Sequence, residues 1–136
     1  MIRHILGVLA YVVGTLVVQG SSHLVFLKAH YDSHSFLRPE PIFALGISSM
    51  LIQGAVLTFV HSKVKLTTNK LFNALTLSWL FGSYVVSYKA LGEAGEFLVP
   101  VISNWIAVET IAGILQYSLI GILLYFAHSS FRREQI

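Results

Sequence analysis

The chain has 136 residues, of which 55% are hydrophobic and only 11% charged, and its mean hydropathy is +0.73. Because soluble domains carry about 25% charged residues, this composition excludes a soluble protein and indicates one all-α integral membrane domain over residues 1–136. The net charge of +3 comes from basic residues scattered at predicted helix ends, which excludes a nucleic-acid surface, and the lack of cysteine excludes disulfides and thiolate metal sites.

Four apolar segments predict four transmembrane helices, at residues 2–26, 42–60, 71–88 and 99–127. Each approaches or exceeds the ~20 residues that cross the hydrocarbon layer. The first segment imitates a signal peptide, but a four-helix count with even basic flanks leads us to expect that it is retained. We therefore expect an antiparallel four-helix bundle with short loops.

The basic residues predict the topology. With the N-terminus inside, the cytoplasmic side holds six of them and the outer loops three, so both termini are expected in the cytoplasm. The inner set is Arg3, Lys63, Lys65, Lys70, Arg132 and Arg133, and the outer set is Lys28, Arg38 and Lys89. The positive side is also expected to contact anionic membrane lipid.

Polar and small residues predict where the third helix begins, where it ends and how it packs. Asn69 is a candidate N-cap, and Gly92 and Gly95 predict the end of the helix. Glycines seven or eight residues apart mark packing faces on the other three helices, whereas the third has only Gly82 among a few small residues. We therefore expect the third helix to be the most peripheral.

Polar side chains inside the predicted spans form stripes at helical spacing. Counting ~1.5 Å of rise per residue, the stripes converge on a polar pocket in the outer half of the bundle. The first helix carries Tyr11, Thr15, Gln19 and His23, the second Ser49 and Gln53, and the fourth Trp105, Glu109 and Gln116. The candidate ligand-binding residues are Gln19, His23, Gln53, Trp105, Glu109 and Gln116.

Glu109 is the most informative of these residues, because ionisable groups inside membrane segments are rare and often functional. One interpretation is a pocket carboxylate with perturbed titration. The other is a structural carboxylate at the outer interface that is hydrated, protonated, or paired with Lys89 or His23. For Gln53 and Gln116 the structural alternative is hydrogen bonding between helices, and for Trp105 an aromatic-belt anchor.

The histidines suggest a metal site as a further alternative. His23, His30 and His34 are seven and four residues apart, so a first helix extended into the outer loop would align them on one face. Turn-forming residues around Asp32 argue against that extension. The other three histidines, His4, His61 and His128, fall at inner helix ends, where they could meet at the surface. No cofactor is assigned by the sequence.

Two stretches carry a resemblance to a known group of proteins. Residues 38–46 (RPEPIFALG) and 49–54 (SMLIQG), together with His23, resemble those of small four-helix inner-membrane proteins of bacteria that have no established activity. Their last helix carries an acidic residue and a glutamine, as Glu109 and Gln116 do here. The resemblance implies a bacterial inner membrane and the same four-helix bundle.

Three classes of function are compatible with these residues. The pocket could bind a small amphipathic or isoprenoid-like molecule, which is the interpretation we favour. The chain could instead be an accessory subunit that docks onto a membrane-protein partner, or form a homo-oligomer. Thirdly, Glu109 and His23 could act as catalytic acid and base on a lipid-soluble substrate. A channel is disfavoured because the chain has no ring of charges and no inverted repeat.

Overall fold

The computed structural model describes residues 1–38 and 40–129, and within these ranges it is helical and contains no strand. The all-α fold class is thus confirmed. The long helices are α1 (Ile2–Thr15), α3 (Phe43–Lys63), α4 (Lys70–Ser87) and α6 (Ile102–Ser129). The short ones are α2 (Lys28–Asp32) and α5 (Glu93–Glu96), with π-helical segments η1 (Leu16–Gly20), η2 (Ser22–Phe26) and η3 (Tyr88–Gly92).

Three helical segments are long and apolar enough to cross a membrane. They are Ile2–Phe26, Phe43–Lys63 and Ile102–Ser129, with mean hydropathies of 1.7, 1.8 and 1.7. They coincide with the first, second and fourth predicted spans. The third predicted span forms α4, which is a helix but is not among these three. Arg132 and Arg133, which contribute to the predicted topology, lie outside the described residues.

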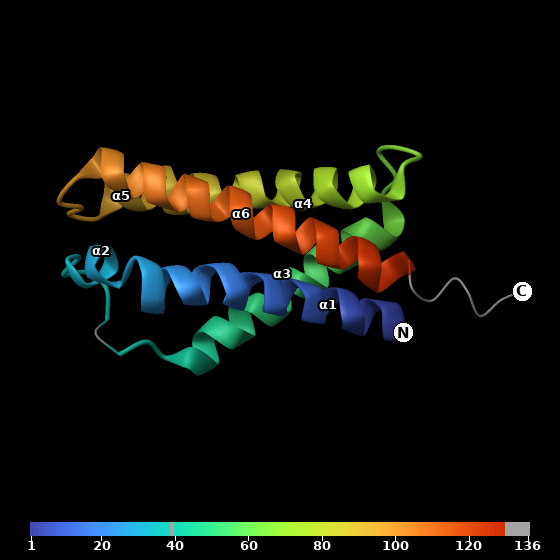
Figure 1. The fold of residues 1–136 in the computed structure, drawn as a ribbon, viewed down its shortest axis with the longest axis horizontal. Helices are drawn as coiled ribbons and strands as arrows, with labels where there is room; N and C mark the ends of the chain where they lie inside the picture. Colours follow the sequence, from blue (N-terminus) through green and yellow to red (C-terminus); the bar gives the residue numbers. More distant parts are fainter. Residues whose placement is uncertain (39, 130–136) are drawn as a thin grey trace, which may run out of the picture.

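The packing of α6 against α1 and α4 organises the molecule. Figure 1 shows α6 lying along α4, with α1 beside them and α3 crossing α1 obliquely. Their shared core is aromatic and aliphatic, and its side chains fill the space between the helices. Its members are Tyr11, Leu57, Tyr117, Ile120 and Leu124.

Small residues allow α4 and α6 to approach closely. Gly82 lies directly against the ring of Tyr117, and Gly113 lies against Val86, so a Cβ atom at either glycine would collide with its neighbour. The hydroxyl of Ser78, which is fully buried, donates to the Tyr117 carbonyl at 2.7 Å. Close contact of this kind is how helices associate where water provides no driving force.

The expectation that the third predicted helix is peripheral is therefore wrong. The most exposed of the long helices is α3, whose buried residues are Gly54, Leu57 and Thr58. In α4, the buried small residues Ala74, Ser78 and Gly82 are spaced four apart and so share one face of the helix. Gly46 of α3, by contrast, has no neighbouring heavy atom within 4 Å of a built Cβ.

The predicted start of the third helix is confirmed, and α4 ends at Ser87, one residue before the predicted end at 88. The expected termination by glycine does not occur. The Asn69 side chain accepts a hydrogen bond from the Phe72 amide at 3.1 Å and caps α4. At the other end the chain continues helically through Gly92, which keeps right-handed torsion angles (φ −63°, ψ −52°), as far as Glu96. A glycine ends a helix by adopting a left-handed conformation, and no described glycine has a positive φ.

The π-helical turns of η1 and η2 keep the polar stripe of the first span in line. In an α-helix, residues four apart drift by about 40° around the axis at each step. The wider π turns reverse this drift from Leu16 onward. Gln19 and His23 consequently stay on the side of the segment that faces α6 and the loops at its end.

Substituting Gly82 with alanine tests the α4–α6 contact. We expect Gly82→Ala to lower the free energy of unfolding by about 1–3 kcal/mol, because the added methyl group must displace the Tyr117 ring. Gly46→Ala is the matched control, since its methyl group meets open space, and it should cause no loss. Thermal unfolding in mild detergent provides the measurement, and equal destabilisation by both substitutions would contradict this packing.

Candidate functional site

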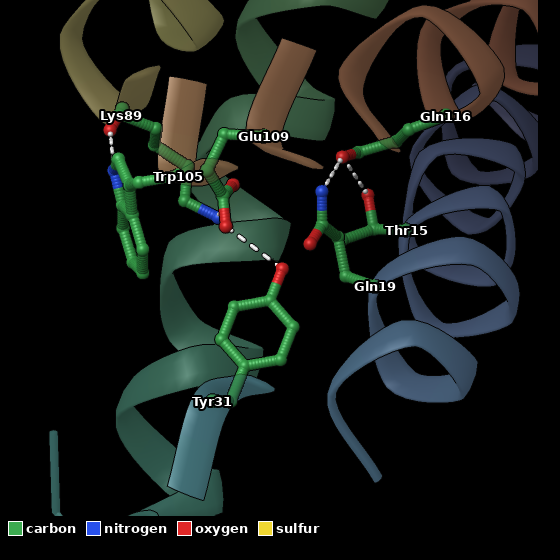
Figure 2. Close-up of polar contacts among 7 residues, drawn as sticks. All are labelled: Thr15, Gln19, Tyr31, Lys89, Trp105, Glu109 and Gln116. Atoms are coloured by element: carbon green, nitrogen blue, oxygen red, sulfur yellow. Dashed lines mark hydrogen bonds and ion pairs between the residues drawn. The ribbon is translucent and has the colours of Figure 1, made fainter. Parts of the chain in front are cut away.

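Glu109 lies at the centre of a buried polar cluster. Its side chain, on α6, is 1% exposed. The Lys89 ammonium nitrogen, from η3, lies 2.8 Å from Oε2, and the Tyr31 hydroxyl, from α2, donates to Oε1 at 2.8 Å (Figure 2). An isolated buried carboxylate would be very costly, and this cation and this donor offset much of that cost. We call Glu109, Lys89, Tyr31 and Trp105 the carboxylate cluster.

Local chain geometry brings these three segments together. The first span ends at Leu27, whose torsion angles (φ −119°, ψ 21°) are not helical, so α2 turns back and directs Tyr31 towards α6. Trp105, 1% exposed, donates its indole N–H to the Lys89 carbonyl at 2.9 Å and holds η3 in place (Figure 2). A small hydrophobic core of Tyr31, Val99 and Trp105 packs around these contacts.

The Tyr31 hydroxyl serves as a donor. Burial and the neighbouring Glu109 carboxylate raise its pKa above the ordinary value of a tyrosine, because both disfavour the phenolate. His23 stacks on the Tyr31 ring, with the ring centroids 3.5 Å apart and the planes inclined by 14°. His23 and Glu109 thus lie on the same side of the molecule and contact the same tyrosine.

Two further polar clusters continue the line of hydrogen bonds along α1 and α6. In the first, Gln19 donates to the Gln116 side-chain oxygen at 2.7 Å, and Gln116 donates to Thr15 at 3.0 Å (Figure 2). In the second, the Tyr11 hydroxyl donates to Gln53 and lies 3.1 Å from the hydroxyl of Tyr117. These bonds join helices to one another, as polar groups inside membranes commonly do.

The structure places the six candidate ligand-binding residues in these clusters rather than around one cavity. Glu109 and Trp105 meet at Lys89, Gln19 bonds to Gln116, Gln53 bonds to Tyr11, and His23 contacts Tyr31. The suggested pairing of Glu109 with Lys89 is confirmed. The structural alternative for Gln53 and Gln116, hydrogen bonding between helices, is likewise what their contacts provide.

Tyr31 and Tyr117 were not among the sequence candidates. Tyr31 could have been found from the sequence. The polar stripe of the first helix repeats every four residues, and continuing it beyond His23 leads through Leu27 to Tyr31. Tyr117 had no such signal, because a tyrosine next to Gln116 is indistinguishable in sequence from a membrane-facing aromatic residue.

The three histidines proposed as a metal site have other contacts. The His34 Nδ1 lies 2.6 Å from the His30 carbonyl oxygen, and both rings pack against Trp105. His23 stacks on Tyr31. Among residues 1–38 and 40–129, no group of three or more histidine, aspartate or glutamate side chains is arranged to hold a metal ion.

A groove between α4 and α6 lies next to the carboxylate cluster. Its volume is about 390 Å³, within the range of small-molecule sites. The walls are mainly apolar, and hydroxyl groups of Ser83, Ser87 and Thr110 supply polar atoms. Its lining residues include Ala90 and Thr110, which directly follow Lys89 and Glu109. Trp79 also lines the groove.

No protein-family model, no curated protein and no solved structure matches the chain. The resemblance to small bacterial inner-membrane proteins therefore depends on the residues quoted above.

A double-mutant cycle on Lys89 and Glu109 tests the buried ion pair. We expect Glu109→Gln and Lys89→Gln each to lower the free energy of unfolding by about 1–3 kcal/mol, less than for a fully buried pair because the Lys89 side chain is 30% exposed. The double variant should be more stable than the sum predicts, by about 1–2 kcal/mol. Thermal unfolding in detergent measures all three.

The exposed pair Lys28–Asp32 is the control for this cycle, since both side chains are 60% exposed. Its cycle should show a coupling of at most a few tenths of a kcal/mol, in the range of about 0.3–0.5 found for helical surface pairs. Strict additivity at Lys89 and Glu109 would show that the buried pair contributes no mutual stabilisation.

Proposed function

We propose that this chain is a four-helix membrane protein that binds a small amphipathic molecule of isoprenoid type in the groove between α4 and α6. The observation that carries the proposal is the groove itself. Its apolar walls suit a branched hydrocarbon tail, and its few hydroxyl groups suit a polar head. The groove contacts the lipid phase in this arrangement, so a lipid-soluble ligand can enter without passing through water.

The hydroxyl groups favour a ligand that donates a hydrogen bond. Ser83 donates to the Leu80 carbonyl at 2.8 Å, and Ser87 donates to the Tyr84 carbonyl at 2.9 Å. Each serine oxygen keeps lone pairs that can accept a further hydrogen bond. An isoprenoid alcohol or a similar hydroxyl-bearing molecule matches this chemistry.

The carboxylate cluster has a supporting role in this proposal. The ion pair Lys89–Glu109 and the bond from Trp105 fix η3 against α6, and η3 carries Ala90 and Leu91 of the groove. The enzymatic alternative receives less support, because Glu109 and His23 do not line this groove and the Glu109 oxygens are engaged by Lys89 and Tyr31.

Binding can be tested with farnesol, a short isoprenoid alcohol, and the fluorescence of Trp79. We expect farnesol to change the tryptophan emission of the wild-type protein in detergent and to have little effect on Trp79→Phe, because Trp105 lies outside the groove. Ser87→Leu should weaken the apparent affinity about tenfold, since the larger side chain takes the place of roughly two ligand methylene groups.

Ser48→Leu is the matched control, because Ser48 is an exposed serine of α3 that bonds a carbonyl of its own helix in the same way. It should leave farnesol binding unchanged. An emission change that persists in Trp79→Phe, or equal weakening by both leucine substitutions, would place the binding elsewhere and reject the groove.

An accessory subunit is the second candidate, and α3 is the observation that favours it. Its first turns are exposed, with open space at Gly46 and a hydrogen bond from Gln53 to the exposed Ser49 at 2.9 Å. Small and polar residues together are typical of helix–helix interfaces in membranes. Recovery of a stoichiometric protein partner in mild detergent would favour this candidate, and recovery of monomer alone would count against it.

The proposed topology places four crossings in a bacterial inner membrane, with both termini in the cytoplasm. The position of α4 supports a fourth crossing, because it lies along α6 (Figure 1) and is bonded to it at Ser78–Tyr117 and Trp79–Ser118. A helix that accompanies a membrane-spanning neighbour in this way traverses the same layer. The basic residues at the Met1 end support the cytoplasmic assignment.

The lack of cysteine makes this topology directly testable. We expect single cysteines at Ser35 and Gly95 to react with an impermeant maleimide added to intact cells, and a cysteine at Thr68 to react only after lysis. All three sites are exposed, and Gly95 has no neighbouring atom within 4 Å of a built Cβ. Opposite reactivities of Ser35→Cys and Gly95→Cys would show that α4 does not cross.

A further inference from the structure

The end of the molecule that carries Met1 contains a second cavity, of different chemistry. Its volume is about 730 Å³, and it is lined from α1, α3, the loop before α4, α4 itself and α6. Six of its lining residues carry or can carry a positive charge: Arg3, His4, His61, Lys65, Lys70 and His128. We call it the basic cavity.

No acidic side chain lines the basic cavity within the described ranges. Two permanently charged lysines, Lys65 and Lys70, thus belong to a described lining that contains no carboxylate. The acidic residues Asp32, Glu93 and Glu96 belong to α2 and α5, which lie at the opposite end of the molecule in Figure 1. This distribution favours an anion as the occupant of the cavity.

Two histidines from different helices form part of the wall. The rings of His61 and His128 are in contact, with centroids 4.5 Å apart and planes inclined by 64°. His128 Nδ1 lies 3.1 Å from the Leu124 carbonyl oxygen, whereas His61 Nδ1 and His128 Nε2 are buried with no hydrogen-bond partner in the described part of the chain. Unpaired buried nitrogens are costly, and these two belong to residues that line the cavity.

The loop that carries the lysines is held in place before any ligand binds. Asn73 accepts hydrogen bonds from the amides of Leu66 and Thr67, at 2.7 and 3.4 Å, and donates to the Val64 carbonyl at 3.3 Å. Asn69 caps α4 immediately before Lys70. Because these bonds fix the loop backbone, less conformational entropy is lost on binding than with a free loop.

From this arrangement we infer that the basic cavity binds a phosphate group. A phosphate presents several acceptor oxygens to the lysines. At neutral pH a phosphate monoester also retains a proton in part, since its second pKa is about 6, and can donate to an imidazole nitrogen. The group can belong to the headgroup of an anionic lipid or to a soluble phosphate, because both present acceptor oxygens to the lysines. Only inorganic phosphate or a monoester also carries a proton for an imidazole nitrogen, since the phosphate of a diacyl phospholipid such as phosphatidylglycerol is a diester.

Two probes distinguish a phosphate in a lipid headgroup from a soluble phosphate. Native mass spectrometry of the full-length protein in mild detergent measures retention of phosphatidylglycerol against phosphatidylcholine, and calorimetry in phosphate-free buffer measures binding of inorganic phosphate. Selective retention of phosphatidylglycerol that excess phosphate does not displace identifies a lipid headgroup. Calorimetric binding of phosphate, or displacement of the lipid by it, identifies a site open to soluble phosphate. Either result supports the inference.

Matched variants test whether the cavity is responsible. The double variant Lys65→Gln/Lys70→Gln should weaken binding of whichever probe binds the wild-type protein about 30-fold. This corresponds to a loss of about 1 kcal/mol of binding free energy for each lysine. His61→Gln should also weaken it. Lys63→Gln is the control, because Lys63 lies at the same end of α3, near the Phe59 ring, and does not line the cavity.

Thermal unfolding of each variant verifies that it remains folded, and the loop lysines are exposed, so the double variant should keep the wild-type midpoint. Binding of neither probe would overturn the inference. Equal weakening by Lys63→Gln and the double variant would overturn it too, because the effect would then reflect the general charge of this end. Binding of farnesol in the α4–α6 groove is unaffected by either outcome.

Discussion

The buried carboxylate of Glu109 is the constraint on which one end of this molecule depends. A charge placed between apolar helices needs a counter-charge and hydrogen-bond donors close by. Lys89 and Tyr31 supply them from η3 and α2, so both segments must fold back onto α6. Trp105 fills the space behind them and bonds to the Lys89 backbone. The connections at this end are thereby held by a polar centre within an apolar shell, and short segments such as α2 gain an order that their length alone would not give.

The two ends of the molecule differ in how their charged groups are arranged. At the Glu109 end, positive and negative groups neutralise each other inside, and the surrounding aromatic rings leave little polar surface to a ligand. At the Met1 end, cations surround an open cavity that no described carboxylate lines. The α4–α6 groove lies between them and has hardly any charge. An apolar ligand and an anionic ligand can therefore bind at separate places without competing for the same side chains.

Composition and hydropathy predicted the helical class and three helices that are long and apolar enough to cross a membrane, because these properties depend on local sequence. The four-residue spacing of Thr15, Gln19 and His23 correctly indicated a polar face, and the Asn69 cap was readable from its side chain. What sequence could not reveal was which small residues face a neighbour. Gly82 lets α4 approach α6 closely, whereas Gly46 of α3 meets open space, and nothing local distinguishes the two glycines. The groove and the basic cavity arise from residues that are distant in sequence, so only the packed helices define them.

The π-helical turns of the first span make its length as important as its composition. Exposed positions such as Val17 and Val25 tolerate many apolar side chains, because they are not packed in the core. A deletion or insertion of one residue between Thr15 and Leu27 would be different, since it would rotate everything beyond it around the helix axis. His23 would then leave the Tyr31 ring, and α2 would start in a new direction. Side chains in this segment can therefore be substituted, whereas a change in the number of residues would shift the helical register.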